Sequence, residues 1–322
     1  MNEPVIIGEA TVKPGTKKLL ELPIAKLVTG TPMSLPVVVL NGRRPGPSVW
    51  LTAAIHGDEI NGTEIVRQVL ETLSPKNLHG TLFAVPVVNV YGFVSGDRYL
   101  PDRRDLNRSF PGSARGSLAR RIAHLLMSEV VGRCDYGIDL HTASDHRTNL
   151  PQIRANLDDP ETRKLAAVFG APVMMHSSHR DGSLRQVASE GGAKVLLYEG
   201  GEAWRFDPQA TRVGVDGVRR VLSHVGMIDT EESRPNATAV SRSSKWVRAS
   251  QSGILALRVE PGHLVSRGQV IGQIHNALGV RLSSPRASID GMVIGSTLSP
   301  VVNRGDAILH IASVSETNGQ SQ

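Results

Sequence analysis

The strongest constraint on this chain is a regular alternation of short apolar runs and helical patterns between residues 48 and 225. Runs such as residues 48–55 (SVWLTAAI) predict buried strands, and most are followed by stretches with apolar residues at helical spacing. This alternation is typical of an α/β domain with a largely parallel, two-faced sheet. Strands are expected at 48–55, 81–90, 137–141, 171–175 and 193–199, and helices at 61–73, 113–131, 160–169 and 209–225.

The segments on either side of this region have a different residue pattern. Residues 1–45 read as short β-like runs divided by glycine and proline, and we assign them to the same domain, residues 1–228. Residues 229–244 are polar, lack an apolar period and predict a linker. Residues 245–312 alternate short β-like runs with glycines and predict a small all-β domain, which we call the C-terminal β region. The polar residues 313–322 predict a mobile tail.

Composition excludes several classes of protein. No apolar run reaches the roughly 18 residues that a membrane helix needs, and the N-terminus lacks the pattern of a secretory signal. The single cysteine, Cys134, excludes an internal disulfide and a cysteine-based zinc site. We therefore expect a cytoplasmic protein that has no membrane partner.

The net charge of +6 raises the question of a nucleic-acid partner. Nucleic-acid binding usually needs clustered cations and often aromatic platforms. Here the basic pairs are scattered and aromatic residues make up only 4% of the chain. We expect no nucleic-acid partner, and interpret the excess charge as a solvated surface or as arginines that serve a small anionic substrate. A homo-oligomer is compatible with the sequence.

Two histidines follow or end predicted buried strands. His56 opens His-Gly-Asp-Glu directly after the strand that ends at Ile55, and His141 ends Asp-Leu-His. Because ligands of such folds lie at the carboxyl ends of strands, we expect His56, Glu59 and His141 to converge on one cation. Two histidines and one glutamate form a three-ligand zinc set that leaves a fourth position open for water. The alternative is that these histidines are ordinary surface or core residues.

Glu199 also ends an apolar strand and is followed by two glycines. A carboxylate at such a position is expensive to bury without a role. Close to an activated water it would serve as general base and later as general acid. The alternative is a structural carboxylate that caps the following segment.

A third group of polar residues is Asp105-Leu106-Asn107-Arg108-Ser109-Phe110-Pro111-Gly112, preceded by Arg98, Arg103 and Arg104. Arginine binds carboxylates through paired hydrogen bonds, and Asn107 offers a further donor. One arginine of this group would stabilise an oxyanion. The alternative, that Arg103 and Arg104 are solvated loop residues, stays open.

In combination, H-G-D-E, D-L-N-R-x-F-P-G, D-L-H-T and Y-E-G-G resemble the succinylglutamate desuccinylase/aspartoacylase family of zinc carboxypeptidase-like hydrolases. The resemblance covers roughly residues 47–225. It implies an α/β fold with a mixed eight-stranded sheet flanked by helices, and hydrolysis of an N-acyl amide bond.

The resemblance also implies roles for particular residues. His56, Glu59 and His141 match the ligands of one zinc ion, and Glu199 matches the carboxylate that activates water. Asn107 and Arg108 match the pair that holds the substrate carboxylate, and Arg185 resembles a further substrate-binding arginine. Arg98 matches the arginine that polarises the carbonyl, with Arg103 as the alternative.

The C-terminal β region is similar to a biotinyl/lipoyl-type barrel-sandwich. In carrier domains a hairpin lysine receives the cofactor, but residues 275–281 contain no lysine and Lys245 is the only one in the region. A lid or specificity wall, or an oligomer contact, is therefore the better hypothesis.

The sequence thus predicts a zinc-dependent amidohydrolase that acts on a small carboxylate-bearing substrate such as an N-acyl amino acid. Two alternatives stay open. One is a metallocarboxypeptidase or peptidoglycan amidase with the same zinc chemistry, and the other is a non-catalytic ligand-binding protein. A serine hydrolase is disfavoured because no G-x-S-x-G motif is present.

Overall fold

A computed structural model describes residues 1–178, 180–229 and 237–315 of the chain. Within those residues no helix combines the length and apolar character that crossing a bilayer requires. The elements up to residue 229 are β1 (Val5–Ile7), β2 (Ala10–Val12), β3 (Thr16–Lys26), β4 (Pro32–Asn41), β5 (Arg44–Ala53), α1 (Asn61–Thr72), β6 (His79–Val85), α2 (Val90–Ser95), η1 (Leu106–Arg108), α3 (Leu118–Glu129), η2 (Val131–Arg133), β7 (Tyr136–His141), β8 (Arg147–Ala155), α4 (Pro160–Phe169), β9 (Val173–His176), α5 (Leu184–Glu190), β10 (Lys194–Glu202) and α6 (Pro208–His224).

The strands after residue 236 belong to the C-terminal part of the chain. They are β11 (Ala239–Arg248), β12 (Gly253–Leu257), β13 (Leu264–Val265), β14 (Gly272–His275), β15 (Arg281–Ser283), β16 (Gly291–Thr297), β17 (Val301–Val302) and β18 (Ala307–Ser315).

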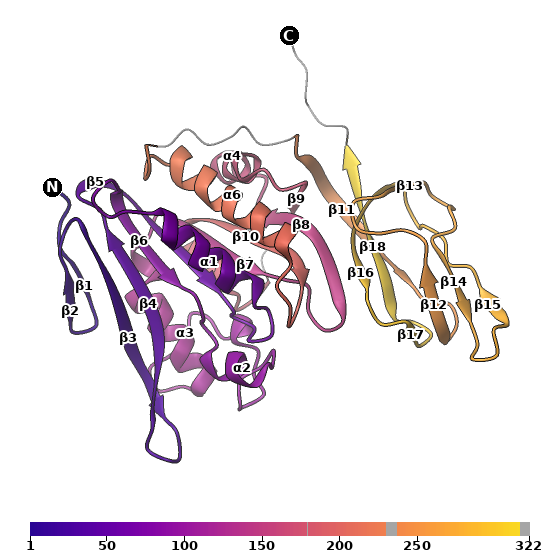
Figure 1. Cartoon of the computed structure of the whole chain (residues 1–322), viewed down its shortest axis with the longest axis horizontal. Helices are drawn as coiled ribbons and strands as arrows, with labels where there is room; N and C mark the ends of the chain where they lie inside the picture. Colours follow the sequence, from indigo (N-terminus) through magenta and orange to yellow (C-terminus); the bar gives the residue numbers. More distant parts are fainter. Residues whose placement is uncertain (179, 230–236, 316–322) are drawn as a thin grey trace, which may run out of the picture.

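A large mixed sheet organises the molecule (Figure 1). Its described strands follow the order β13-β16-β18-β11-β9-β8-β10-β7-β5-β6-β4-β3. β5, β6, β7 and β10 run parallel to their neighbours within this group, whereas β3, β4 and β8 introduce antiparallel pairs. The eight strands from β3 to β10 are contiguous in the sheet, which confirms the mixed α/β fold predicted from the sequence.

Helices cover both faces of the sheet and bury two separate apolar cores. α1, α4 and α6 pack on one face, where Val66, Phe169 and Val218 contribute to the core. α3 and α5 pack on the other face with Ile122 and Leu184. A sheet covered in this way leaves its strand ends as the places where polar side chains can gather.

The C-terminal strands continue the large sheet as well as forming a small sheet of their own. β11 pairs with β9, and β16 pairs with β8, so strands from both parts of the chain share one ladder. β15, β14, β12 and β17 form the small sheet, and its side chains share an apolar core with Val247, Val293 and Leu309 of the larger one. A C-terminal all-β region is therefore present, but its edge is joined to the main sheet.

Part of the predicted linker is wrong as a description of structure. Residues 230–236 lie outside the described residues, but residues 239–244 form the first half of β11. Ala239 packs against Leu150 and Val173, and Ser241 is buried beside it on the same face. The buried positions in this half of the strand, Ala239 and Ser241, carry small or polar side chains, so they produced no apolar period. Similarly, residues 313–315 of the predicted tail end β18, and residues 316–322 lie outside the described part.

Candidate metal centre and active site

Three neighbouring parallel strands bring the predicted site residues to one edge of the sheet. β7 lies between β5 and β10, with Ala53 paired to Leu140 and Glu199 paired to His141. His56 lies three residues beyond the end of β5, whereas His141 and Glu199 are themselves strand residues. The parallel register therefore places His56, His141 and Glu199 at the same edge, as the sequence predicts.

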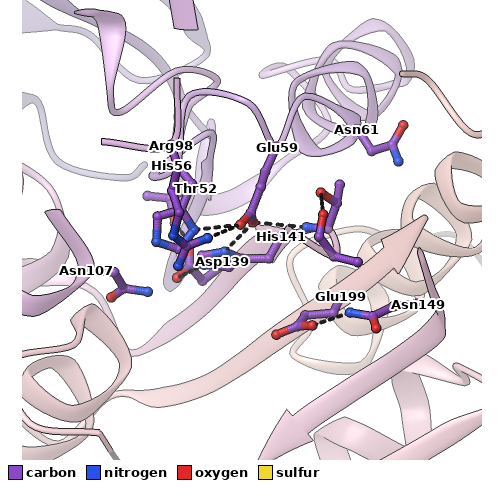
Figure 2. Close-up of polar contacts among 12 residues, drawn as sticks. Thr52, His56, Glu59, Asn61, Arg98, Asn107, Asp139, His141, Asn149 and Glu199 are labelled. Atoms are coloured by element: carbon purple, nitrogen blue, oxygen red, sulfur yellow. Dashed lines mark hydrogen bonds and ion pairs between the residues drawn. The ribbon is translucent and has the colours of Figure 1, made fainter. Parts of the chain in front are cut away.

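The side chains of His56, Glu59 and His141 form a compact buried cluster (Figure 2). Nδ1 of His56 lies 2.7 Å from Oε1 of Glu59, and Nδ1 of His141 lies 2.8 Å from Oε2. One ligand atom from each residue falls within 4.8 Å of the others. Only 2–5% of each residue's surface is exposed. The chain thus brings two imidazoles and a carboxylate to one point.

Each histidine contacts an aspartate through its second ring nitrogen, Nε2. Nε2 of His56 lies 3.2 Å from Oδ1 of Asp105, and Nε2 of His141 lies 2.9 Å from Oδ2 of Asp139. Thr52 in turn donates to Oδ1 of Asp139 at 2.7 Å. Such carboxylate partners fix the ring orientation and tautomer of metal-binding histidines and make the opposite nitrogen more basic.

The charged groups of the cluster shift one another's pKa values. Burial by itself would raise the pKa of Glu59, but the two imidazoles hold it well below its ordinary value. Burial likewise opposes protonation of both histidines, yet Glu59 and the aspartates behind the rings raise the pKa of His56 and, further, that of His141. The buried carboxylate is therefore ionised at neutral pH, as a metal ligand must be.

A glycine permits the turn that carries the cluster. A Cβ at Gly57 would overlap the backbone of Gly92, so the segment between His56 and Glu59 packs directly on α2. The helix α1 then begins at Asn61 and directs the chain away from the sheet edge. This close approach keeps Glu59 within reach of both histidines.

The donor set fits a zinc ion. Two imidazole nitrogens and one carboxylate, each buried and aligned by a second partner, are the ligands found in three-ligand zinc sites. His56, Glu59 and His141 would hold the ion.

The cluster opens into a cavity of about 520 Å³ that is lined mainly by polar residues. Its wall contains the acidic residues Glu59, Glu199 and Asp306, and seven arginines face the same space. The arginines are Arg98, Arg108, Arg147, Arg154, Arg180, Arg185 and Arg248. A cavity with this balance of charge favours an anionic ligand.

Glu199 reaches the cavity beside His141 and is 16% exposed as a side chain. Its Oε2 accepts a hydrogen bond from Nδ2 of Asn149 at 2.5 Å and lies 3.3 Å from Nη2 of Arg154. Among the described residues no group donates to its Oε1. The carboxylate thus has one anchored oxygen and one oxygen available for proton transfer.

The structure places the two candidate arginines very differently. Arg98 lines the cavity, and its Nη1 lies 2.8 Å from Oε1 of Glu59. Arg103 is exposed, is absent from the cavity wall and has a left-handed backbone with φ of 59°. Of the pair that the sequence left open, Arg98 is the one beside the metal-ligand cluster.

The remaining predicted substrate residues also line the cavity. Asn107 accepts a hydrogen bond from the backbone of Leu184 at 2.9 Å through Oδ1, and Arg108 donates to the Asn107 carbonyl. Arg185 is 5% exposed and donates to Ser177 and Ser178. Burial, together with the nearby charges of two other arginines, lowers the pKa of Arg185 to about 10.

Sequence reasoning missed one whole wall of the cavity. β8 was not predicted, yet it contributes Arg147, Asn149 and Arg154. The C-terminal part adds Trp246 and His310, whose rings stack with centroids 4.3 Å apart. Polar residues on β8 were the available signal, but the β8–β10 ladder shifts register between Glu199 and Gly201, so they keep no single alternation. Pro151 and the absence of an apolar run obscured the strand further.

Comparisons with known proteins match the part of the chain that carries these residues. The sequence model of the succinylglutamate desuccinylase/aspartoacylase catalytic domain matches residues 45–225. N-alpha-acetyl-L-2,4-diaminobutyric acid deacetylase of Halomonas elongata is 30% identical over 299 residues, which cover 88% of this chain and 87% of that protein.

Solved structures share the fold over nearly the whole chain. A succinylglutamate desuccinylase/aspartoacylase from Rhodobacter sphaeroides superposes with a TM-score of 0.82 at 26% identity, covering 93% of this chain and 96% of that one. The product-bound ectoine utilization protein EutE of Ruegeria pomeroyi superposes with a TM-score of 0.83 at 23% identity, covering 92% and 95%. Because both comparisons extend beyond residue 225, the shared fold includes the C-terminal strands.

Proposed function

The chain belongs to the succinylglutamate desuccinylase/aspartoacylase family, and from this we propose that it is a zinc-dependent deacylase. It would cleave the N-acyl amide bond of a small substrate that carries a carboxylate, such as an N-acyl amino acid. The observation that carries the proposal is the buried cluster of His56, Glu59 and His141 at the base of a cavity that also contains Glu199. The relative from Halomonas, which by its name deacetylates an N-acetyl amino acid, supports this substrate class.

A zinc ion held by His56, Glu59 and His141 would supply a Lewis acid that polarises the acyl carbonyl and acidifies a water molecule. Oε1 of Glu199 would accept the proton of the attacking water. The same carboxyl group would then give that proton to the departing nitrogen, so that the products are a carboxylate and a free amine.

Cationic residues would orient the substrate. Arg98 would donate to the oxygen on which negative charge develops. Arg108 and Nδ2 of Asn107 would bind the substrate carboxylate, since Oδ1 of Asn107 is already engaged by Leu184. Arg185, held by Ser177 and Ser178, would add a second positive charge on that side.

The division of the chain follows from the same proposal. We assign residues 1–228 to the hydrolase domain and residues 245–312 to a wall of its cavity, because Trp246, Arg248 and His310 line that space. No lysine lies between residues 275 and 281, which disfavours a cofactor-carrier role for this region.

The test uses the purified protein with zinc measured by mass spectrometry. The substrates are N-acetyl and N-succinyl amino acids, N-alpha-acetyl-2,4-diaminobutyrate, short peptides and peptidoglycan fragments. We expect about one zinc per chain, release of free amine from N-acyl amino acids, loss of activity with a chelator and recovery with zinc. Preferential cleavage of peptides would instead identify a carboxypeptidase or amidase, and no zinc with no hydrolysis would identify a binding protein.

A further inference from the structure

We propose that Asn149 is the positioning residue for Glu199, and that Gly295 of the C-terminal β region holds Asn149 in place. This inference rests on the proposed function, because it concerns the carboxylate assigned as general base. It gives the C-terminal strands a direct part in the reaction: they support the strand that aims the base.

The contact between Asn149 and Glu199 divides the two carboxylate oxygens. Nδ2 of Asn149 donates to Oε2 at 2.5 Å (Figure 2). Nη2 of Arg154 lies 3.3 Å from the same oxygen. Oε1 receives no hydrogen bond from the described residues. A carboxylate held by one oxygen cannot rotate without losing that bond, so its free oxygen keeps a fixed direction.

The hydrogen bond from Asn149 to Glu199 differs in charge from the ion pair that Arg154 makes with the same carboxylate. An amide donor fixes Oε2 without adding a positive charge, whereas Arg154 is a full cation that could take both oxygens in a paired fork. If Asn149 were lost, Glu199 would be left to Arg154 alone. The carboxylate could then turn Oε1 toward the guanidinium and away from the substrate.

Backbone pairing determines where Asn149 lies. It is paired with Gly201 of β10 on one side and with Gly295 of β16 on the other, close to the point where β10 shifts register between Glu199 and Gly201. The neighbouring pairs Thr148–Ser296 and Arg147–Thr297 belong to the same β8–β16 ladder. Asn149 is thus clamped between the strand that carries Glu199 and a strand from the C-terminal part.

Gly295 is the point at which this clamp can be tested. A Cβ at Gly295 would lie 2.6 Å from Oδ1 of Asn149, which is closer than a Cβ atom comes to any non-bonded heavy atom. The nearest backbone atom, the carbonyl oxygen of Thr148, would lie at 3.1 Å. The end of the Asn149 side chain would therefore move before the backbone does, so Gly295→Ala disturbs the amide more than the fold.

The central variant is Asn149→Asp in the full chain. This change preserves size and shape but replaces the donor with a carboxylate that repels Glu199. We expect kcat for an N-acyl amino acid to fall roughly 10- to 100-fold, with KM, zinc content and melting temperature close to wild type. As the pH is lowered, the introduced carboxyl group protonates and donates again, so the ratio of variant to wild-type kcat should rise. A purely structural role would give a ratio that does not depend on pH.

Two further variants complete the design. Gly295→Ala should also lower kcat, and the double variant with Asn149→Asp should lose less than the product of the two single effects, because both changes break one contact. Asn77→Asp makes the same chemical change at an exposed position outside the cavity and should leave kcat unchanged.

Crystal structures of wild type and Asn149→Ala should show the Glu199 carboxylate turned toward Arg154 in the variant only.

The outcomes separate the two proposals. If wild type hydrolyses N-acyl amino acids but Asn149→Asp keeps its kcat, loses zinc, or shows the same deficit at every pH, the positioning role is wrong and the proposed function stands. If wild type neither binds zinc nor hydrolyses the panel, the proposed function is wrong and this inference falls with it.

Discussion

The imidazoles of His56 and His141 stand edge to face, with ring centroids 5.1 Å apart and planes inclined by 61°. Their Nδ1 atoms both point to Glu59, and their Nε2 atoms point to aspartates on the outside of the cluster. The inner nitrogens are thus the ones available to a cation. Because Asp105 and Asp139 bond the outer nitrogens of the two rings, they should control metal affinity without contacting the metal.

Asp139→Asn should weaken zinc binding about 10- to 100-fold. The amide keeps the shape of the aspartate, but it cannot stabilise a positive charge on His141 or make its Nδ1 more basic. Competition with a chromogenic chelator measures the affinity. Asp216→Asn, an exposed change on α6, serves as the control. Wild-type affinity in the Asp139→Asn variant would show that this contact does not act on the metal site.

Glu199→Gln should retain zinc and lose turnover. The amide cannot accept a proton from water, so kcat should fall on the order of 10²- to 10⁴-fold, while substrate binding measured by calorimetry stays within a few-fold. Glu202→Gln, on the same strand but outside the cavity wall, should behave as wild type. Unchanged turnover in Glu199→Gln would remove this residue from the mechanism.

Arg98→Ala should lower kcat roughly 10²- to 10³-fold, as expected for loss of one donor to a developing oxyanion. Arg103→Ala should have little effect, because Arg103 is exposed and lies outside the cavity wall. Steady-state kinetics on the best N-acyl amino acid distinguishes them. If only Arg103→Ala shows the large loss, the assignment of the two arginines must be exchanged.

His310 should make the fold less stable in acid. Burial, aided by the nearby charge of Arg154, lowers the pKa of His310 to about 4 from its ordinary value of 6.5. The unfolded chain therefore binds a proton at a higher pH than the folded chain does. The stabilisation from neutral His310 is complete above about pH 6.5 and is lost as the pH falls toward 4.

This effect is isolated by comparing wild type with His310→Gln. The stability of wild type should fall relative to the variant by up to about 3 kcal/mol between pH 6.5 and 4, at 1.36 kcal/mol per pH unit. Urea unfolding at a series of pH values measures the difference and cancels the opposing contributions of other histidines. Parallel pH profiles for the two proteins would show that His310 titrates normally.

The sequence was informative where local rules and burial agree. The helix at residues 160–169 was predicted with the bounds that the structure has, because Asp159 caps it, Pro160 starts it and Gly170 ends it with a left-handed backbone. The polar residues at the ends of apolar strands were also readable, since isolated buried charges are expensive and few other positions could carry them.

The same rules failed along β8. Its residues 152–155 alternate between an apolar face, with Ile153 and Ala155, and a polar one with Gln152 and Arg154, and the register shift against β10 interrupts this alternation before Asn149. A strand that lines a polar cavity loses the apolar run that reveals a buried strand, and Pro151 argues further against it. Hydrophobic periodicity therefore did not predict the strand β8 that forms this wall of the cavity.

By itself the sequence determined the α/β class, the strand ends that carry His56 and His141, and the family to which the chain belongs. Only the tertiary structure decided that Arg98 rather than Arg103 lines the cavity, and that C-terminal strands extend the same sheet to reach Asn149. The physical reason is the range of the interactions. Capping and burial depend on residues near in sequence or on composition, whereas the aim of a side chain depends on strand pairings between residues far apart, such as Asn149 and Gly295.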